Sequence, residues 1–510
     1  MSCLPFSGRP LRTHHSPLPL FVVDVAEYYR FDGWLVNIEV PLKQEGAVED
    51  MCLFVSQLTQ EMHRRLPGSL VIWYDSVTKN GDLAWQDQLN DLNRGFFDAA
   101  DGLFSNYCWK EEYPQASAVA AGVRRRQVFM GCDIFGRNTF GGGGFSAHKA
   151  LKVIAEAHTS VALFAPAWTY ETFEKQAHAD LDSRFWTGDG QPATSELGSI
   201  ADYVQPRICS ASDMLHCSFD RGFGERLFLN GALLGEGDFG NIHRQSVQPT
   251  WIPWTKKDEA VFASTGERAF NGGTSLRVTL GASHAPVTTY YRLFLTRLGL
   301  LGSLRFCFAV APTLGESKTH LSLRFTLNTG VTVTPLAETR NIGNGWFVHA
   351  GPVFSGRLPD GEFIREVGLE VEHRQPGSDE VVFLGEVSVY DQGILKAQGL
   401  LENDDHTFEP ENPVIANLVA DDIITIGENN FVTLSWEISP SFKPSHFNVY
   451  EGSVFLGTAF CSRFRARHKH EPVEGQHTDG GRRATIFTVQ PVSSLGVPQQ
   501  LSTCLRVKVF

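Results

Sequence analysis

The sequence predicts an α/β domain followed by all-β domains, in a chain of 510 residues. Three observations carry this prediction. Residues 21–175 alternate strand-length apolar runs with helical stretches. From about residue 206, short alternating strands separated by Gly, Asn and Pro replace that pattern. With 42% hydrophobic and 20% charged residues, the composition is that of a globular protein, and the length suits about three domains of roughly 100–200 residues each.

Five strands and five helices are expected in the α/β part, after a poorly ordered, proline-rich leader at residues 1–20. The expected strands are Gly33–Val40, Ser69–Val77, Gly102–Trp109, Gln127–Phe135 and Ser160–Trp168. The expected helices are Val22–Phe31, Met51–Leu66, Leu83–Phe97, Pro114–Arg126 and Phe145–Glu156. Strands this apolar, separated by helices, predict parallel pairing, in either a closed barrel or an open doubly wound sheet.

The second half of the chain is expected to form two antiparallel β-sandwiches. Its strands alternate polar and apolar residues between turn-forming residues, as in "TSLRVTLGA" and "SLRFCFAVA". A loop rich in Asn, Asp, Glu and Pro at about 402–415 separates the two. We therefore expect domains at 21–205, at 206–400 (galactose-binding-like) and at 401–510, where the pattern resembles a fibronectin-III-like sandwich.

Charge and cysteine content narrow the partners and the compartment. The net charge of −13 argues against nucleic acid or an anionic membrane as the main partner, and no apolar run reaches the ~20 residues of a membrane span. The nine cysteines include no C-x-x-C pair, and no Asn-x-Ser/Thr acceptor occurs. The cysteines suit a reducing compartment, and the missing acceptor suits a protein that is never exposed to the glycosylation machinery, so we expect the cytosol.

The stretch "FDGWLVNIEV" ends with two polar residues, Asn37 and Glu39. Side chains alternate along a strand, so both share one face with Leu35. The carboxyl ends of parallel strands form the active face of a barrel, which suits a carboxylate and an amide to acid–base work. The alternative is a Glu that caps or anchors a loop, the commoner role of an isolated Asn-x-Glu.

The segment "DGWLVNIE" resembles the chitinase-type D-G-x-D-x-D-x-E strand, with Leu35 in place of the middle Asp and Asn37 in place of the last. This variant is similar to glycoside hydrolase family 85, the endo-β-N-acetylglucosaminidases. Four later segments support the resemblance: "WYDSVTKNGDLAWQDQLN", "FSNYCW", "GCDIFGRNTFGGGGF" and "LFAPAWTYE". "FDRGFGERLFLNG" extends it, so that it covers roughly residues 21–231.

The resemblance implies a cofactor-free, metal-free hydrolysis of the GlcNAc-β1,4-GlcNAc core of N-glycans. Asn37 cannot act as a nucleophile, so the 2-acetamido oxygen of the substrate attacks the anomeric carbon and forms an oxazoline. Asn37 would orient that acetamide, and Glu39 would protonate the leaving oxygen and then deprotonate water. Tyr74 would hydrogen-bond the acetamide or the intermediate; alternatively, it is a strand tyrosine with a satisfied hydroxyl.

Further residues are expected to contact the sugar. Trp85 would form a lip over the acceptor subsite and Trp168 a floor under the sugar, with packing an equal alternative for both. Asn106, Trp109 and Asp133 are further strand-end candidates. The glycine run Gly141–Phe145 is expected as a loop on the active face, and the basic run Arg463–His470 as a solvated loop. No His/Cys cluster has zinc spacing. The expected partners are N-glycans, free oligosaccharides or glycoproteins, bound by a monomer, with no nucleic acid and no membrane.

In the family the Asn-x-Glu strand is the fourth of eight, whereas here it is the first of five. The expected fold is therefore a (β/α)8 TIM-type barrel lacking about its first three βα units, followed by two β-sandwich domains. The motif strand would form an open edge, and we expect this form to be weakly active or inactive. Two alternatives remain: a chitinase-like hydrolase of family 18, which Leu35 and Asn37 disfavour, and a non-catalytic glycan-binding or scaffold protein.

Overall fold

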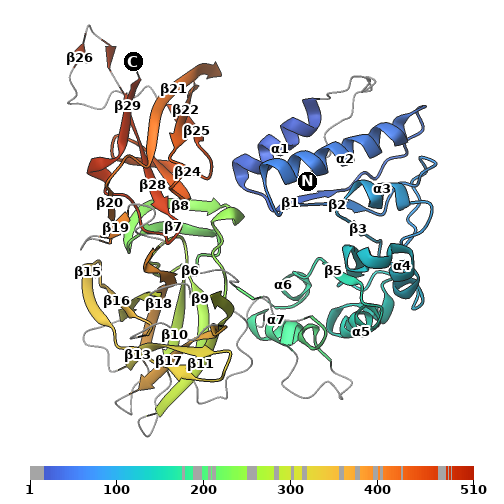
Figure 1. Ribbon diagram of the computed structural model, residues 1–510, viewed down its shortest axis with the longest axis horizontal. Helices are drawn as coiled ribbons and strands as arrows, with labels where there is room; N and C mark the ends of the chain where they lie inside the picture. The colour runs from blue at the N-terminus through green and yellow to red at the C-terminus, as the bar shows by residue number, and fades with distance from the viewer. Residues whose placement is uncertain are drawn as a thin grey trace. The chain divides into compact units, whose positions relative to one another are not determined.

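The computed structural model describes most of the chain, which divides into two compact units, residues 1–205 and 206–510 (Figure 1). The described residues are 17–174, 178–187, 198–204, 208–209, 214–249, 261–280, 287–299, 304–312, 319–354, 361–373, 380–393, 400–402, 406–426, 429–468, 478–479, 482–483 and 485–509. No described helix is long and apolar enough to cross a membrane.

The first unit contains a sheet of five parallel strands paired in chain order. They are β1 (Gly33–Val36), β2 (Leu70–Tyr74), β3 (Gly102–Phe104), β4 (Val128–Asp133) and β5 (Ser160–Phe164). All five expected strands and their parallel pairing are confirmed. Each ends before the expected residue, since the chain leaves the ladder at the carboxyl end to form the loops that carry polar side chains.

One face of this sheet packs on helices. The helices are α1 (Pro17–Tyr29), α2 (Ala47–Arg65), α3 (Arg94–Ala99), α4 (Tyr113–Ala121), α5 (His148–Glu156), α6 (Trp168–Thr172) and α7 (His178–Thr187). The longest, α2, buries Met51, Val55, Leu58 and Met62, whose spacing of three and four residues places them on one side of the helix. They share a core with Trp73 and the other strand residues that point to this face.

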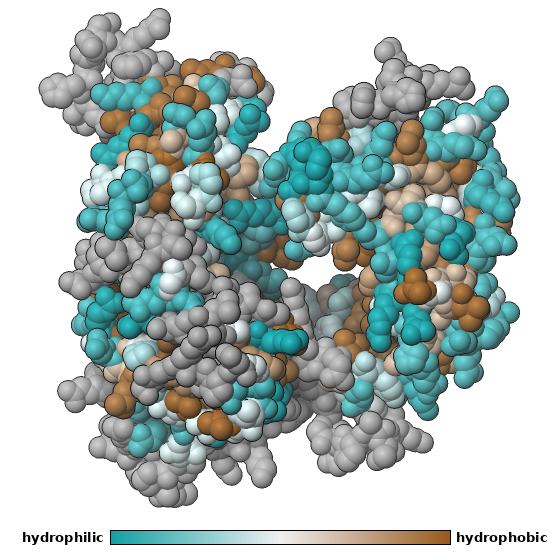
Figure 2. Space-filling model, viewed as in Figure 1, coloured by the Kyte–Doolittle hydropathy of each residue, from teal (hydrophilic) through white to brown (hydrophobic). Residues whose placement is uncertain are grey.

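The opposite face of the sheet carries a mixture of apolar and polar side chains. Leu35, Leu70 and Phe164 expose between 42% and 50% of their surface there. The register places Tyr74 and Phe104 side by side on this face, at the carboxyl ends of β2 and β3. Figure 2 shows mainly hydrophilic side chains on the visible surface of this unit, interrupted by separate apolar patches.

Two expectations for the first unit are wrong in part. The helix expected at Leu83–Phe97 is only α3, because residues 83–93 form an irregular loop. In that loop Asn and Asp side chains hydrogen-bond the backbone, for example Asn93 Oδ1, which accepts from Asn90 N at 2.9 Å, and such bonds compete with a helix. The leader was expected to extend to residue 20, but α1 begins at Pro17, where proline is tolerated in a first turn. Residues 1–16 lie outside the described part.

A smaller correction concerns the helix expected at Pro114–Arg126. It is divided into α4 and a 3₁₀ segment, Gly122–Gln127, because Gly122 adopts φ 60° at the end of α4. The helix expected from Phe145 begins at His148, after 3₁₀ turns at Phe140–Gly142 and Gly144–Ser146.

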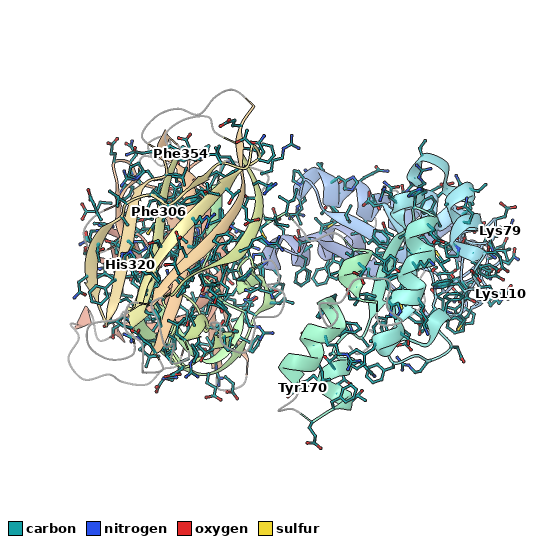
Figure 3. The ribbon with its side chains drawn as sticks, turned by 90° about the horizontal axis from the view of Figure 1, so that it is seen from below. Lys79, Lys110, Tyr170, Phe306, His320 and Phe354 are labelled. Carbon is teal, nitrogen blue, oxygen red and sulfur yellow. The ribbon has the colours of Figure 1, made fainter. Side chains whose placement is uncertain are left out.

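The second unit consists mainly of antiparallel strands. Its strands up to residue 400 are β6 (Met214–Cys217), β7 (Phe223–Leu229), β8 (Ala232–Gly240), β9 (Val261–Thr265), β10 (Ser275–Leu280), β11 (Val287–Gly299), β12 (Leu304–Pro312), β13 (Thr319–Leu327), β14 (Thr332–Val333), β15 (Glu338–Gly343), β16 (Trp346–Pro352), β17 (Phe363–His373) and β18 (Glu380–Asp391). A seven-stranded sheet (β15-β16-β12-β18-β10-β9, with β6 on β18) and a four-stranded sheet (β11-β17-β13-β14) contribute to one apolar core. Phe306, labelled in Figure 3, belongs to that core, whereas His320 is exposed.

The remaining strands form smaller sheets. They are β19 (Leu400–Glu402), β20 (Phe408–Pro410), β21 (Ile415–Ile426), β22 (Asn429–Ile438), β23 (Pro444–Glu451), β24 (Val454–Ala459), β25 (Arg463–His468), β26 (Thr478–Asp479), β27 (Arg482–Arg483), β28 (Thr485–Ser493) and β29 (Leu505–Val509). The sheets β21-β22-β25 and β24-β23-β28-β29 share a core with Phe270 and Trp346, from the preceding part of this unit. The basic run expected as a loop is instead strand β25 as far as His468, because it pairs with β22; residues 469–470 lie outside the described part.

Candidate active site

Asn37 and Glu39 lie directly after β1, at the carboxyl end of the first strand. Residues 34–39 keep the alternation of a strand beyond the last paired residue: Leu35, Asn37 and Glu39 are exposed, while the residues between them pack towards the core. The segment is held beside β2 by Ser76, whose Oγ donates to the carbonyl oxygen of Ile38 at 2.7 Å. Asn37 Nδ2 lies 3.4 Å from Glu39 Oε1, so the two side chains are adjacent.

Tyr74 ends β2 on the same face of the sheet. Its hydroxyl donates to Asn106 Oδ1 at 2.9 Å. Burial raises the pKa of Tyr74, and the neighbouring Tyr107 and the negative charge of Glu39 raise it further. The phenol therefore stays protonated at neutral pH, and its single O–H is the one donated to Asn106.

Asn106 lies in the loop after β3 and is held by hydrogen bonds on both sides of its amide. Its Nδ2 donates to Asp87 Oδ1 at 2.7 Å, which turns its Oδ1 towards Tyr74. Asp87 Oδ1 also accepts from the backbone N–H of Cys108 at 3.1 Å. Asn106, one of the residues predicted to contact sugar, thus links the loop after β3 to the loop after β2 through its bond to Asp87.

Asp133 ends β4 and is 2% exposed. Its carboxylate accepts two bonds from Arg137, from Nε at 2.6 Å and from Nη2 at 3.1 Å, and one from the backbone N–H of Phe135. The carboxylate is therefore occupied by its own loop. This loop presents the side chain of Arg137 to solvent, 65% exposed. The Arg137 guanidinium lies 5.9 Å from the ring centroid of Phe164.

The three predicted tryptophans have different surroundings. Trp85 is 42% exposed, in the loop after β2. Trp109 is 3% exposed; its Nε1 donates to the Gly131 carbonyl oxygen at 2.6 Å and its ring stacks on Phe140. Trp168 is partly buried at the start of α6, with its ring edge-on to Phe145. Trp85 is therefore free to meet a ligand, whereas the contacts of Trp109 favour packing.

The glycine run forms a tight turn at the carboxyl end of β4. Gly141 to Gly144 all adopt positive φ, between 50° and 88°, a region that favours glycine. At Gly144 a Cβ atom would lie 3.1 Å from the Trp168 ring. The glycines thus allow the loop to approach that indole closely.

Sequence reasoning missed three residues of the site, Asp75, Tyr107 and Arg137. Tyr107 lies beside Tyr74, with ring centroids 6.4 Å apart, and its ring also contacts Phe164. Burial raises the pKa of Tyr107, and the charges of Asp133 and Glu39 add to that rise. Their proximity in the sequence could have identified them. Asp75 follows Tyr74, Tyr107 follows Asn106, and Arg137 is four residues after Asp133.

The polar residues of the candidate site come from the loops at the carboxyl ends of the strands. Lys79 and Lys110, from the loops after β2 and β3, lie on the same side of this unit in Figure 3. Among the described residues, no group of three or more His, Cys, Asp or Glu side chains is placed to hold a metal ion. The polar groups at these strand ends are four carboxylates, two amides, two phenols and one guanidinium: Glu39, Asp75, Asp87, Asp133, Asn37, Asn106, Tyr74, Tyr107 and Arg137.

Comparison with known proteins gives one family match. Residues 14–227 match the model of glycosyl hydrolase family 85. Cytosolic endo-beta-N-acetylglucosaminidase 1 of Arabidopsis thaliana is 42% identical over 228 residues, which cover 45% of this chain and 32% of that protein. Cytosolic endo-beta-N-acetylglucosaminidase of Gallus gallus is 37% identical over 298 residues, covering 57% of this chain and 38% of that protein. The match thus spans about a third of the length of these curated relatives.

A solved structure shares the fold. The glycoside hydrolase domain of Endo-D from Streptococcus pneumoniae R6 superimposes with a TM-score of 0.68 at 19% sequence identity. The superposition covers 96% of this chain and 76% of that one.

Proposed function

We propose that this chain, which carries a glycosyl hydrolase family 85 domain over residues 14–227, is an endo-β-N-acetylglucosaminidase acting on the GlcNAc-β1,4-GlcNAc core of N-glycans. The observation that carries the proposal is the pairing of Asn37 with Glu39 at the carboxyl end of β1, 3.4 Å apart and on the face of the sheet that Tyr74 shares. The names of the relatives support the same activity.

The reaction that suits this pair is substrate-assisted. A retaining glycosidase generally uses two carboxylates about 5–5.5 Å apart, and here an amide stands beside a single carboxylate. The acetamide oxygen of the substrate attacks C1 and the C1–O bond to the next sugar breaks. Glu39 gives its proton to the departing oxygen. A water molecule then attacks C1 of the oxazoline, Glu39 takes its proton, and the acetamide is restored.

The orientation of Asn37 supports its assigned role. Its Nδ2 points to Glu39, so its Oδ1 is left to accept the N–H of the substrate acetamide. Such a bond aligns the acetamide oxygen with C1 and stabilises the positive charge that develops on the oxazoline. Tyr74 carries a neutral O–H on the same face, which the substrate would take over from Asn106 Oδ1, and Trp85 offers an exposed ring for the sugar on the acceptor side.

The five parallel strands and the paired antiparallel sheets support a finer description of the fold. We propose that the first unit is part of a (β/α)8 TIM-type barrel, and that residues 206–400 and 401–510 form two β-sandwich domains. We also propose a cytosolic location. It is supported by the names of the relatives and by the eight described cysteines, none of which is in a disulfide.

The experiment is digestion of a labelled high-mannose glycopeptide at high protein concentration, with mass analysis of the peptide. The expected product keeps one GlcNAc on the asparagine, and Glu39→Gln should not form it. An intact glycopeptide after prolonged incubation would contradict the proposal, as would a peptide without any GlcNAc. Cleavage of chitin oligomers in place of the glycopeptide would favour a chitinase-like enzyme.

A further inference from the structure

Asp75 follows Tyr74 at the end of β2 and is 1% exposed. Four N–H groups surround its carboxylate. The donors to Oδ2 are the backbone N–H groups of Gln86 at 3.0 Å, Asp87 at 2.7 Å and Asn106 at 3.4 Å, and the donor to Oδ1 is Asn93 Nδ2 at 2.9 Å. The donors come from the loop after β2 and from the loop after β3, so one buried carboxylate joins both loops to the strand that ends in Tyr74.

The first of these loops carries Trp85. Asp75 binds the two N–H groups that follow Trp85 in the chain, and Ala84 N donates to the Ser76 carbonyl oxygen at 3.0 Å just before it. The backbone on both sides of Trp85 is thereby held against the end of β2. Since the indole itself is 42% exposed, its position depends on this backbone and not on burial of its ring.

The second connection leads to the Tyr74 hydroxyl. Asp87 adopts φ 57°, a left-handed conformation that is unfavourable for a residue with a side chain, and its N–H is bound by Asp75. In that conformation its Oδ1 holds Asn106 Nδ2, and Asn106 Oδ1 accepts from Tyr74. Asp75 therefore reaches the hydroxyl of its neighbour in sequence through Asp87 and Asn106.

We propose that Asp75 is a positioning residue of the site: it sets the Trp85 loop at the acceptor side and, through Asp87 and Asn106, the direction of the Tyr74 hydroxyl. It touches no reacting atom. The inference rests on the proposed function, since it assigns Tyr74 and Trp85 to glycan cleavage. An Asp side chain offers two acceptor oxygens to these four donors, whereas an Asn side chain has one acceptor atom and adds two donors of its own.

The test compares Asp75→Asn with Asp101→Asn. Asp101 also anchors backbone, because its Oδ2 accepts from Val71 N at 2.7 Å and pairs with His63, but it lies at the amino end of the sheet. For glycopeptide cleavage, Asp75→Asn should lower kcat by about 10- to 100-fold, as expected when a catalytic group is displaced by about 1 Å. Asp101→Asn should leave kcat close to the wild-type value, because Asp101 lies at the opposite end of the strands from the site.

A double-mutant cycle separates positioning from general loss of fold. If Asp75 acts through Tyr74, the loss of kcat caused by Asp75→Asn should shrink to a few-fold in the Tyr74→Phe background. An equal loss in both backgrounds would overturn the connection to Tyr74. A wild-type protein that leaves the glycopeptide intact would instead contradict the proposed function.

Hydrogen exchange tests the inference whether or not the protein cleaves the glycopeptide. Asp75→Asn should speed amide exchange in residues 84–93 and 105–108 by at least about tenfold, while peptides from α2 keep the wild-type rates. Asp101→Asn should leave both loops unchanged. Wild-type exchange of the two loops in Asp75→Asn would overturn the proposal.

Discussion

Asn37 Nδ2 lies 3.4 Å from Glu39 Oε1, on the face that both side chains share after β1. In the reaction proposed above, this contact suits the two residues to different parts. The amide is turned so that its oxygen can accept from a substrate acetamide, and the carboxylate is left as the group that can transfer a proton. The strand alternation that places them together continues for three residues beyond the last ladder pair of β1.

Removal of the Tyr74 hydroxyl should damage catalysis more than folding. Tyr74→Phe should lower kcat for the glycopeptide by about 10²-fold, as loss of a donor to the developing charge does in other enzymes. The free energy of unfolding should fall by only about 1 kcal/mol, since Asn106 Oδ1 loses one donor. Steady-state kinetics and urea unfolding measure the two effects. An unchanged kcat would remove Tyr74 from the site.

The tryptophans should divide according to their exposure. Trp85→Ala should raise KM for the glycopeptide and change the free energy of unfolding by less than about 0.5 kcal/mol, because the ring is 42% exposed. Trp109→Ala should cost about 3–5 kcal/mol, because its ring is buried and its Nε1 bonds to Gly131. Urea unfolding and steady-state kinetics on both variants measure the change in stability and the change in KM. A stable Trp109→Ala protein with a raised KM would return Trp109 to the list of sugar contacts.

Arg137 should support the loop after β4. In Arg137→Met the buried Asp133 carboxylate loses both guanidinium bonds and keeps the Phe135 N–H. The free energy of unfolding should fall, because the buried Asp133 carboxylate is left underbonded. Arg137→Lys should recover part of this, as a point charge without the paired geometry. Urea unfolding that does not distinguish Arg137→Met from wild type would contradict the account of this pair.

Asp75 should make stability depend on pH in a defined direction. Burial raises the pKa of Asp75 from 3.8 to about 7, although its four N–H donors oppose that rise. Between these two pH values the folded protein holds a proton that the unfolded chain has lost. The contribution of Asp75 to stability therefore falls as the pH rises from about 4 to about 7, and is constant above that range.

The measurement is urea unfolding of wild type and Asp75→Asn across this pH range. The stability of wild type relative to Asp75→Asn should decrease as the pH rises from about 4 to about 7. A difference that is independent of pH, or that grows in favour of wild type, would show that the Asp75 carboxyl does not titrate in this way.

The sequence was sufficient for the strands of the first unit but not for the loops that follow them. A buried strand can be recognised from its own residues, as a short apolar run such as "SLVIWYDSV". No knowledge of distant contacts is needed for this. The loop at 83–93 was expected to be helical, as part of the stretch Leu83–Phe97. The conformation of this loop depends on hydrogen bonds to Asp75, which lies outside the loop at the end of β2. The local sequence pattern of residues 83–93 does not reveal that partner.

The site shows the same division. Asn37 and Glu39 could be placed on one face from strand alternation, and Tyr74 at a strand end. The pairing of Tyr74 with Asn106 spans 32 residues, and that of Asp133 with Arg137 depends on how the glycine-containing loop turns. Burial of Trp109 likewise depends on Phe140, a residue of a different loop. Contacts of this kind arise from the arrangement of loops at the sheet edge.

The most direct test of the central claim uses a preformed sugar oxazoline in place of the glycopeptide. Asn37 is assigned to formation of the oxazoline and Glu39 to the steps on both sides of it. Asn37→Ala should therefore process the oxazoline at close to the wild-type rate while failing on the glycopeptide, and Glu39→Gln should be defective on both. Equal defects of the two variants on the oxazoline would contradict the assigned roles and the substrate-assisted mechanism with them.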